Sequence, residues 1–208
     1  LWSPDSQTVA FIAITRQGLT LLLDDLSDDP SADFVLGQGP LWISWSHNSQ
    51  YMLIHRGASQ FLLDTSGDLQ PELLDFQTAR YRVPAWKPRG DAVTVMRETE
   101  PNRYSLYTVD VAGGDEQNIT GTGLHEFSPV VSPDGRMIAF LSGSGDSVAV
   151  EVMELNGSLR QQLTSATGVH GSQRWAPDGD RIAYVSQIGQ NGLIYVANVD
   201  GSQNMLLT

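Results

Sequence analysis

Short runs of β-branched and aromatic residues recur along the chain, and clusters of turn-forming residues separate them. Five of these runs have similar positions in a repeat and are expected as β-strands at 8–14, 51–55, 92–97, 137–141 and 182–185. Val, Ile, Tyr and Phe favour the extended backbone of a partly buried strand. No segment shows a sustained helical period with capping residues. The pattern predicts an all-β protein.

A common pentapeptide, which we call the anchor motif, precedes each of these five strands. Its copies are WSPDS at 2–6, WSHNS at 45–49, WKPRG at 86–90, VSPDG at 131–135 and WAPDG at 175–179. Their first residues are separated by 43, 41, 45 and 44 positions. Near-constant steps of this size are typical of a four-stranded β-propeller blade.

The anchor motif has a mechanical explanation. Proline fixes φ and removes a hydrogen-bond donor, so it ends the innermost strand of a blade. Asp or Asn followed by Gly or Ser then makes a tight turn into the second strand. The tryptophan is expected to pack between neighbouring blades, where a flat ring buries a large area.

The rest of each repeat completes a blade. Third strands are expected at 105–110, 148–155 and 193–199, followed by turns such as Asn156-Gly157 and Asp200-Gly201 that supply positive φ angles. Fourth strands are expected to close on Ile-Thr or Leu-Thr pairs at 119–120, 163–164 and 207–208. We therefore predict a single β-propeller domain over residues 1–208, with four-stranded antiparallel blades at about 1–39, 40–80, 81–124, 125–169 and 170–208.

These features resemble the TolB-type propeller repeat, in which Trp-Ser-Pro-Asp-Gly is followed by Arg-Ile-Ala-Tyr, Ile-Tyr-Val, Asp-Gly and Leu-Thr. The copies at 127–164 and 172–208 fit this pattern best, whereas His47-Asn48 replaces Pro-Asp and Arg89 stands where Asp is expected. The resemblance implies a ring of six blades, or seven as in related propellers. Because the first blade here lacks most of its innermost strand, we expect the sequence to be part of a longer protein.

Composition excludes several classes of partner. The chain has 24 acidic and 12 basic residues, for a formal charge of −12, which disfavours nucleic acid and anionic membrane surfaces. It has no cysteine, so disulfides, thiolate catalysis and zinc–thiolate sites are excluded. No apolar run approaches the ~20 residues of a membrane helix, and we expect no membrane insertion.

Signatures of catalysis are also missing. The sequence contains no Gly-x-Ser-x-Gly elbow, no P-loop and no glycine-rich dinucleotide motif. We predict that the chain is not an enzyme, has no catalytic residues and binds no cofactor.

Binding residues are expected on one side of the blades, which we call the loop face. It carries the connections between second and third strands, expected as long loops at 98–103, 142–146 and 187–191, and the connections between blades. Function concentrates in irregular loops over a rigid scaffold. The candidate ligand- or partner-binding residues in the inter-blade connections are Arg80, Tyr81, Arg82, His125, Glu126 and His170.

Two interpretations of these residues compete. His125, His170 and an arginine have the chemistry to hold a metal or an anionic ligand. Alternatively, the two histidines are solvated loop residues, which we favour because a metal site usually needs three or more protein ligands. We therefore predict no metal site.

Three functions remain open, because a fold alone does not specify one. The favoured one is a non-catalytic scaffold that docks a protein partner on the loop face or at the channel mouth. The resemblance to TolB implies a bacterial cell-envelope setting, periplasmic or secreted. The alternatives are the substrate-gating propeller of a prolyl-oligopeptidase-like serine peptidase and a metal-dependent carbohydrate-active propeller. Unpaired strand edges of an open ring are also expected to promote self-association.

Overall fold

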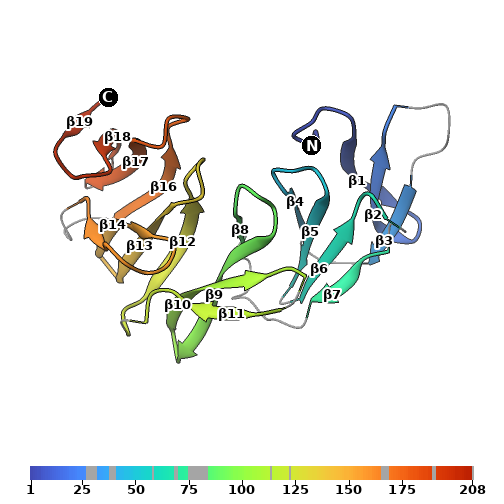
Figure 1. The fold of residues 1–208 in the computed structure, drawn as a ribbon, viewed down its shortest axis with the longest axis horizontal. Helices are drawn as coiled ribbons and strands as arrows, with labels where there is room; N and C mark the ends of the chain where they lie inside the picture. Colours follow the sequence, from blue (N-terminus) through green and yellow to red (C-terminus); the bar gives the residue numbers. More distant parts are fainter. Residues whose placement is uncertain are drawn as a thin grey trace. The chain divides into compact units, whose positions relative to one another are not determined.

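The computed structural model describes residues 1–26, 32–37, 41–57, 59–67, 70–74, 84–112, 114–121, 123–164, 169–188 and 191–207. Within these ranges the strands form five antiparallel sheets (Figure 1). The same ranges contain no helix, and hence none with the length and hydropathy to cross a membrane. The chain divides into two compact units, Leu1–Tyr81 and Arg82–Thr208.

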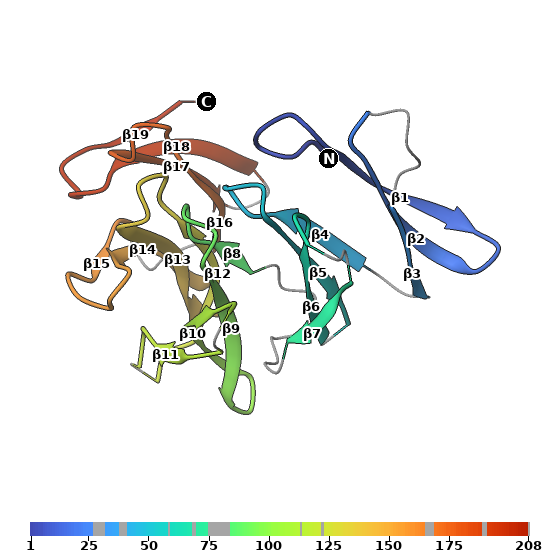
Figure 2. The ribbon, with the colours of Figure 1, turned by 45° about the vertical axis from the view of Figure 1, so that its right-hand side comes forward.

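The first unit contains two sheets, which we call blades one and two (Figure 2). Blade one has the order β1-β2-β3, and Trp2 adds an isolated bridge to Val9. Blade two has the order β4-β5-β6-β7. The strands are β1 (Val9–Thr15), β2 (Gly18–Asp24), β3 (Ala32–Gly37), β4 (Leu41–Trp45), β5 (Tyr51–Arg56), β6 (Ser59–Asp64) and β7 (Glu72–Leu74).

The second unit contains blades three, four and five, each with four strands in sequential order. Blade three consists of β8 (Ala85–Trp86), β9 (Ala92–Glu100), β10 (Arg103–Asp110) and β11 (Glu116–Asn118). Blade four consists of β12 (Glu126–Val131), β13 (Met137–Ser144), β14 (Ser147–Glu154) and β15 (Gln161–Gln162). Blade five consists of β16 (Val169–Trp175), β17 (Arg181–Ile188), β18 (Asn191–Asn198) and β19 (Asn204–Leu206). The predicted all-β propeller class is confirmed.

The connections between second and third strands differ from expectation. Long loops were predicted at 98–103 and 142–146, and this was wrong. Pairing continues until Arg103 lies opposite Glu100 and Ser147 opposite Ser144. Asn102 (φ 61°) and Gly145 (φ 58°) supply the positive φ of the tight hairpins. In blade five, Ile188 pairs with Asn191, and residues 189–190 lie outside the described ranges.

In three of its five copies the anchor motif is held together by its serine, whereas Lys87 and Ala176 stand at this position in blades three and five. The Ser132 hydroxyl donates to Asp134 Oδ1 (2.6 Å) and accepts from the Met137 amide (2.9 Å), which ties the turn to the start of β13. Ser3 and Ser46 make the same pair of bonds in blades one and two. The last residue of every copy has a positive φ, which favours glycine: Ser6, Ser49, Gly90, Gly135 and Gly179.

The Ile-Thr and Leu-Thr pairs at 119–120 and 163–164 close the ladder between the third and fourth strands. Thr164 Oγ1 accepts a hydrogen bond from the Val150 amide (2.9 Å), while the Leu163 amide donates to the Val150 carbonyl (2.9 Å). In blade three, Thr120 Oγ1 likewise accepts from the Leu106 amide, and the Ile119 amide donates to the Leu106 carbonyl. The strands β11 and β15 end at Asn118 and Gln162, and the pair that follows each of them adds one more backbone bond to the third strand. The threonine hydroxyl takes the place of a backbone carbonyl at the end of the ladder.

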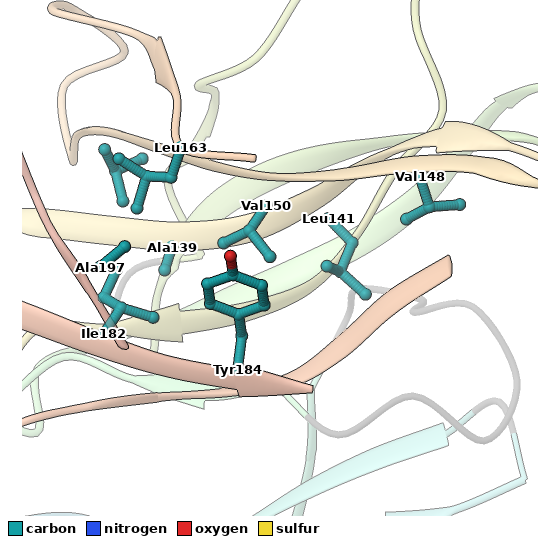
Figure 3. Packing of buried hydrophobic residues seen from close by; sticks show 9 residues of the cluster. Ala139, Leu141, Val148, Val150, Leu163, Ile182, Tyr184 and Ala197 are labelled. Carbon is teal, nitrogen blue, oxygen red and sulfur yellow. The ribbon is translucent and has the colours of Figure 1, made fainter. Parts of the chain in front are cut away.

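Blades four and five bury their facing surfaces against each other (Figure 3). Ala139, Leu141 and Val150 come from blade four, and Ile182 and Tyr184 from blade five; the Tyr184 ring points toward Val150. A second cluster joins blades one and two in the first unit. Apolar burial of this kind contributes about 25 cal/mol per Å².

Two tryptophans of the anchor motif join blades as predicted. The indole Nε1 of Trp175 donates to the Val130 carbonyl of blade four (2.8 Å). Trp45 Nε1 points in the same way at the Leu1 carbonyl (3.4 Å). Val130 and Leu1 each stand one residue before the anchor motif of the preceding blade, so the two contacts are equivalent. Trp86 is buried, whereas Trp2 is 54% exposed and does not follow the prediction.

We predict that Thr164→Val lowers the free energy of unfolding by about 1–3 kcal/mol, because the buried Val150 amide loses its acceptor. Thr94→Val is the matched control. Thr94 is fully buried, and its Oγ1 has no hydrogen-bond partner in the described part of the chain. Urea unfolding should show little change or a gain for the control; equal losses in both variants would contradict the role given to Thr164.

The anchor turn should also contribute to acid sensitivity. The Ser132 hydroxyl, and then the Arg136 amide, hold the pKa of Asp134 below its ordinary value. A lowered folded-state pKa stabilises the fold above the unfolded pKa of about 3.9, and this contribution is lost as pH falls through the folded value. Asp134→Asn keeps the turn, as Asn48 does beside Ser46. Urea unfolding from pH 6 down to about pH 2 should give this variant a weaker pH dependence than the parent; identical curves would refute the assignment.

Candidate functional site

The structure places three of the six candidate residues. Arg80, Tyr81 and Arg82 lie outside the described ranges. Glu126 begins β12, and His170 is the second residue of β16, so both belong to innermost strands and not to loops as expected. They pair with Ser142 and Ser186 at corresponding positions of blades four and five. His125 directly precedes β12.

Glu126 is part of a buried ionic network in blade four. Its side chain is fully buried, and its Oε1 lies 3.0 Å from Arg160 Nη1. Arg160 also bonds the Glu151 carboxylate through Nε and the Ser142 hydroxyl through Nη2 (3.2 Å). Its guanidinium lies 5.0 Å from the centre of the Phe140 ring. Glu126 is thus a structural partner of Arg160, which reaches across the sheet to the innermost strand.

The electrostatics of this network favour the charged arginine. Burial opposes the charge on Arg160, but hydrogen bonds to Glu151 and Glu126 outweigh it and raise the pKa above its ordinary value. Arg160 was not among the sequence candidates, because it follows a turn and belongs to no motif. The available signal was Glu151, an acidic residue between Val150 and Val152 in a predicted strand.

His125 belongs to an aromatic cluster at the loop face of blades three and four. Its ring centre lies 5.2 Å from that of Tyr104 and 4.8 Å from that of Phe127. The Gly143 amide donates to the His125 carbonyl (3.0 Å), which fixes the backbone against β13. Leu124, next in sequence, is 51% exposed. We call Tyr104, Leu124, His125 and Phe127 the aromatic cluster.

Charged groups lie beside the aromatic cluster. Arg103 Nη1 donates to the Gly123 carbonyl (3.0 Å) and lies 3.3 Å from the Glu100 carboxylate. Both side chains are more than half exposed. Aromatic residues and arginine are enriched at protein interfaces, where a few of them carry most of the binding energy. Neither Arg103 nor Tyr104 was among the predicted binding residues: Arg103 ends the segment 98–103 that was predicted as a long loop, and Tyr104 directly follows it.

His170 is buried rather than solvated. Its ring meets Tyr184 edge-on, with centres 5.8 Å apart. Burial raises the pKa of Tyr184 above its ordinary value, and the Tyr184 hydroxyl donates to Asn204 Oδ1. Nearby, the side-chain amide of Gln173 donates to the Ser128 carbonyl of blade four. His170 is therefore packed against Tyr184 within blade five.

A metal site finds no support in the residues that the structure describes. Among them, no group of three or more His, Cys, Asp or Glu side chains is placed to hold an ion. His125 and His170 each pack against a different aromatic residue. The candidate site is therefore an aromatic and charged contact surface around His125.

The sheets, the repeat and the contacts between blades define the class of this protein, a β-propeller built from blades of 41–45 residues. The model of the TolB beta propeller domain matches residues 83–208. The chain belongs to this family, and the resemblance found in the sequence is confirmed.

Curated relatives point the same way. Over 86 residues, 41% of this chain and 20% of the relative, the chain is 34% identical to the Tol-Pal system protein TolB of Thioalkalivibrio sulfidiphilus (strain HL-EbGR7). Over 80 residues, 38% of this chain and 18% of the relative, it is 32% identical to the protein of the same name from Coxiella burnetii (strain RSA 493 / Nine Mile phase I). The matches thus span about a fifth of the length of these relatives.

Solved structures share the fold at low identity. A putative TolB from Agrobacterium tumefaciens superposes with a TM-score of 0.69 at 22% identity, covering 85% of this chain and 65% of that one. An oligogalacturonate lyase from Vibrio parahaemolyticus gives 0.74 at 16% identity, covering 99% and 63%. A prolyl endopeptidase gives 0.74 at 19% identity, covering 99% and 34%. At these identities the likeness shows the fold alone.

We predict that Arg160→Met destabilises the protein by about 3–5 kcal/mol, because it leaves the buried Glu126 and Glu151 carboxylates without their counter-charge. Arg136→Met is the control. Arg136 lies 3.8 Å from Asp134 at the surface, with 85% of its side chain exposed, and should cost less than about 1 kcal/mol. Equal effects of the two substitutions in thermal or urea unfolding would show that the network contributes no more than a surface ion pair.

Proposed function

We propose that the five repeats form one propeller domain that binds a protein partner on its loop face and catalyses no reaction. The observation that carries this proposal is the aromatic cluster, in which three rings are held together beside the exposed Leu124. Arg80, Tyr81 and Arg82, which precede β8 in the sequence, are proposed as further binding residues. Membership of the TolB beta propeller domain family supports a binding role.

The physical advantage of such a surface is rigidity. The His125 backbone is bonded to β13, and the Tyr104 backbone is paired in a hairpin, so little conformational entropy is lost on binding. Apolar rings supply contact area, and the exposed Arg103–Glu100 pair supplies polar contacts at the rim. The charge of −12 favours a basic or mixed segment of the partner over an acidic one at this face.

The cellular setting is proposed by analogy with the relatives. Two of them are Tol-Pal system proteins by name, and the TolB resemblance implies an envelope partner in the periplasm or outside the cell. The likeness to a prolyl endopeptidase and to an oligogalacturonate lyase concerns the fold and supports neither a gating nor a carbohydrate-active role here.

The test requires a purified partner. Proteins captured from an envelope extract on the immobilised chain would be identified, purified and titrated by calorimetry. Leu124→Ser combined with His125→Ala should weaken binding at least about tenfold, because both contribute to the aromatic cluster. Arg80→Ala combined with Arg82→Ala should also weaken it.

Leu159→Ser is the matched control. Leu159 is 74% exposed on the connection between β14 and β15, so losing its side chain removes apolar surface away from the cluster. Binding to this variant should stay within about twofold of the parent. A partner whose affinity is unchanged by both double variants would reject the loop face as the binding surface.

A further inference from the structure

The outer edge of blade one differs from those of the other blades. Its outermost strand, β3, has six residues, whereas the outermost strands β7, β11, β15 and β19 have only two or three. Very short edge strands limit pairing with other chains. In the described residues β3 pairs with β2 on one side alone, so it is the long open edge of this part of the chain.

A cavity of about 370 Å³ runs along this edge. Four consecutive residues, Asp33 to Leu36, line it together with Arg56, Phe61 and other residues of blade two. Successive side chains of a strand point to opposite faces, so a cavity bordered by four in a row follows the edge of the strand. Its volume falls in the range of ligand-binding sites.

Arg56 is held in place within this cavity. Its Nη1 donates to the Leu36 carbonyl (2.6 Å), and its guanidinium lies 5.2 Å from the centre of the Phe61 ring. None of the ion pairs among the described residues includes Arg56 or Asp33. The remaining guanidinium N–H groups have the geometry to bind a carboxylate in a fork. The cavity thus offers an oriented cation and, on β3, the carboxylate of Asp33.

We propose that β3 and this cavity bind an extended segment of a partner protein, which adds a strand to blade one and places a carboxylate on Arg56. In strand addition, main-chain hydrogen bonds supply affinity and pockets for alternate side chains supply specificity. Here the apolar pocket contains Ile54 and Phe61, and the charge is set by Arg56. Asp33 disfavours a second acidic residue at its own position along the segment.

This surface lies in the first unit, whereas the aromatic cluster lies in the second. The inference therefore does not depend on the function proposed above. An acidic segment is repelled by a chain of charge −12 in general, so its binding at Arg56 requires the local contacts described here.

The experiment uses the 208-residue chain and labelled octapeptide pools in fluorescence anisotropy. The first pool alternates Val, Ile, Thr or Phe with Ser and has one fixed Glu; a second has Gln at that position; a third carries N-methyl groups on alternate backbone amides. The first pool should bind, the second at least about tenfold more weakly, and the third not at all, because N-methylation removes the ladder donors. Hydrogen exchange should slow at residues 32–37 when the first pool is bound.

Arg56→Gln should weaken binding of the first pool at least about tenfold, to the affinity that the parent chain has for the Gln pool. Arg16→Gln removes the same charge from the β1–β2 turn and should change binding by less than about twofold. The proposal is overturned by no binding of the first pool up to about 1 mM, by equal binding of the N-methylated pool, or by an effect of Arg16→Gln as large as that of Arg56→Gln. A dimer of the chain in sedimentation, with the two copies paired through β3, would overturn the proposal as well.

Discussion

Everything else in the structure depends on the stacking of one apolar blade face on the next. A repeat of 41–45 residues forms a small sheet that cannot bury its own hydrophobic face, so it is stable only against a neighbour. The contact between Ala139, Val150 and Tyr184 shows this packing at blades four and five. The tryptophan of the anchor motif adds a directional bond to it at two places. The indole of Trp45 or Trp175 donates to the backbone just before the anchor motif of the preceding blade, at Leu1 or Val130.

The buried charges of blade four and the third-strand amides near these packed faces are tolerated because they have hydrogen-bond partners. The Arg160 guanidinium is held by Glu126, Glu151 and Ser142. One amide within each of the third strands β10 and β14 is held by the hydroxyl of Thr120 or Thr164. A buried charge without a partner lowers the stability of the fold by several kcal/mol. A buried hydrogen-bond donor without a partner lowers it by about 1–3 kcal/mol. The buried Glu126, a candidate binding residue, has its partner in Arg160.

The surfaces available for binding are those that are not buried between stacked blades. At the loop face, the tight hairpin of β9 and β10 brings Tyr104 against His125 and presents a preformed aromatic surface. On the first unit, the long edge of β3 leaves backbone groups and Arg56 beside an open cavity. The two proposed binding surfaces differ in kind: one consists of side chains on rigid hairpins, and the other of a strand edge.

The sequence by itself determined the all-β class, the five blades, the positions of most strands and the turn chemistry of the anchor motif. These depend on local signals: β-branched residues, proline, and residues that adopt positive φ, repeated at near-constant spacing. Only the tertiary structure decided how far β9 and β13 extend, because pairing with the next strand overrode the turn-like composition at 98–103 and 142–146. It also decided the surroundings of His125, Glu126 and His170. Tyr104, Arg160 and Tyr184 reach them through contacts between strands far apart in the sequence, which no local pattern encodes.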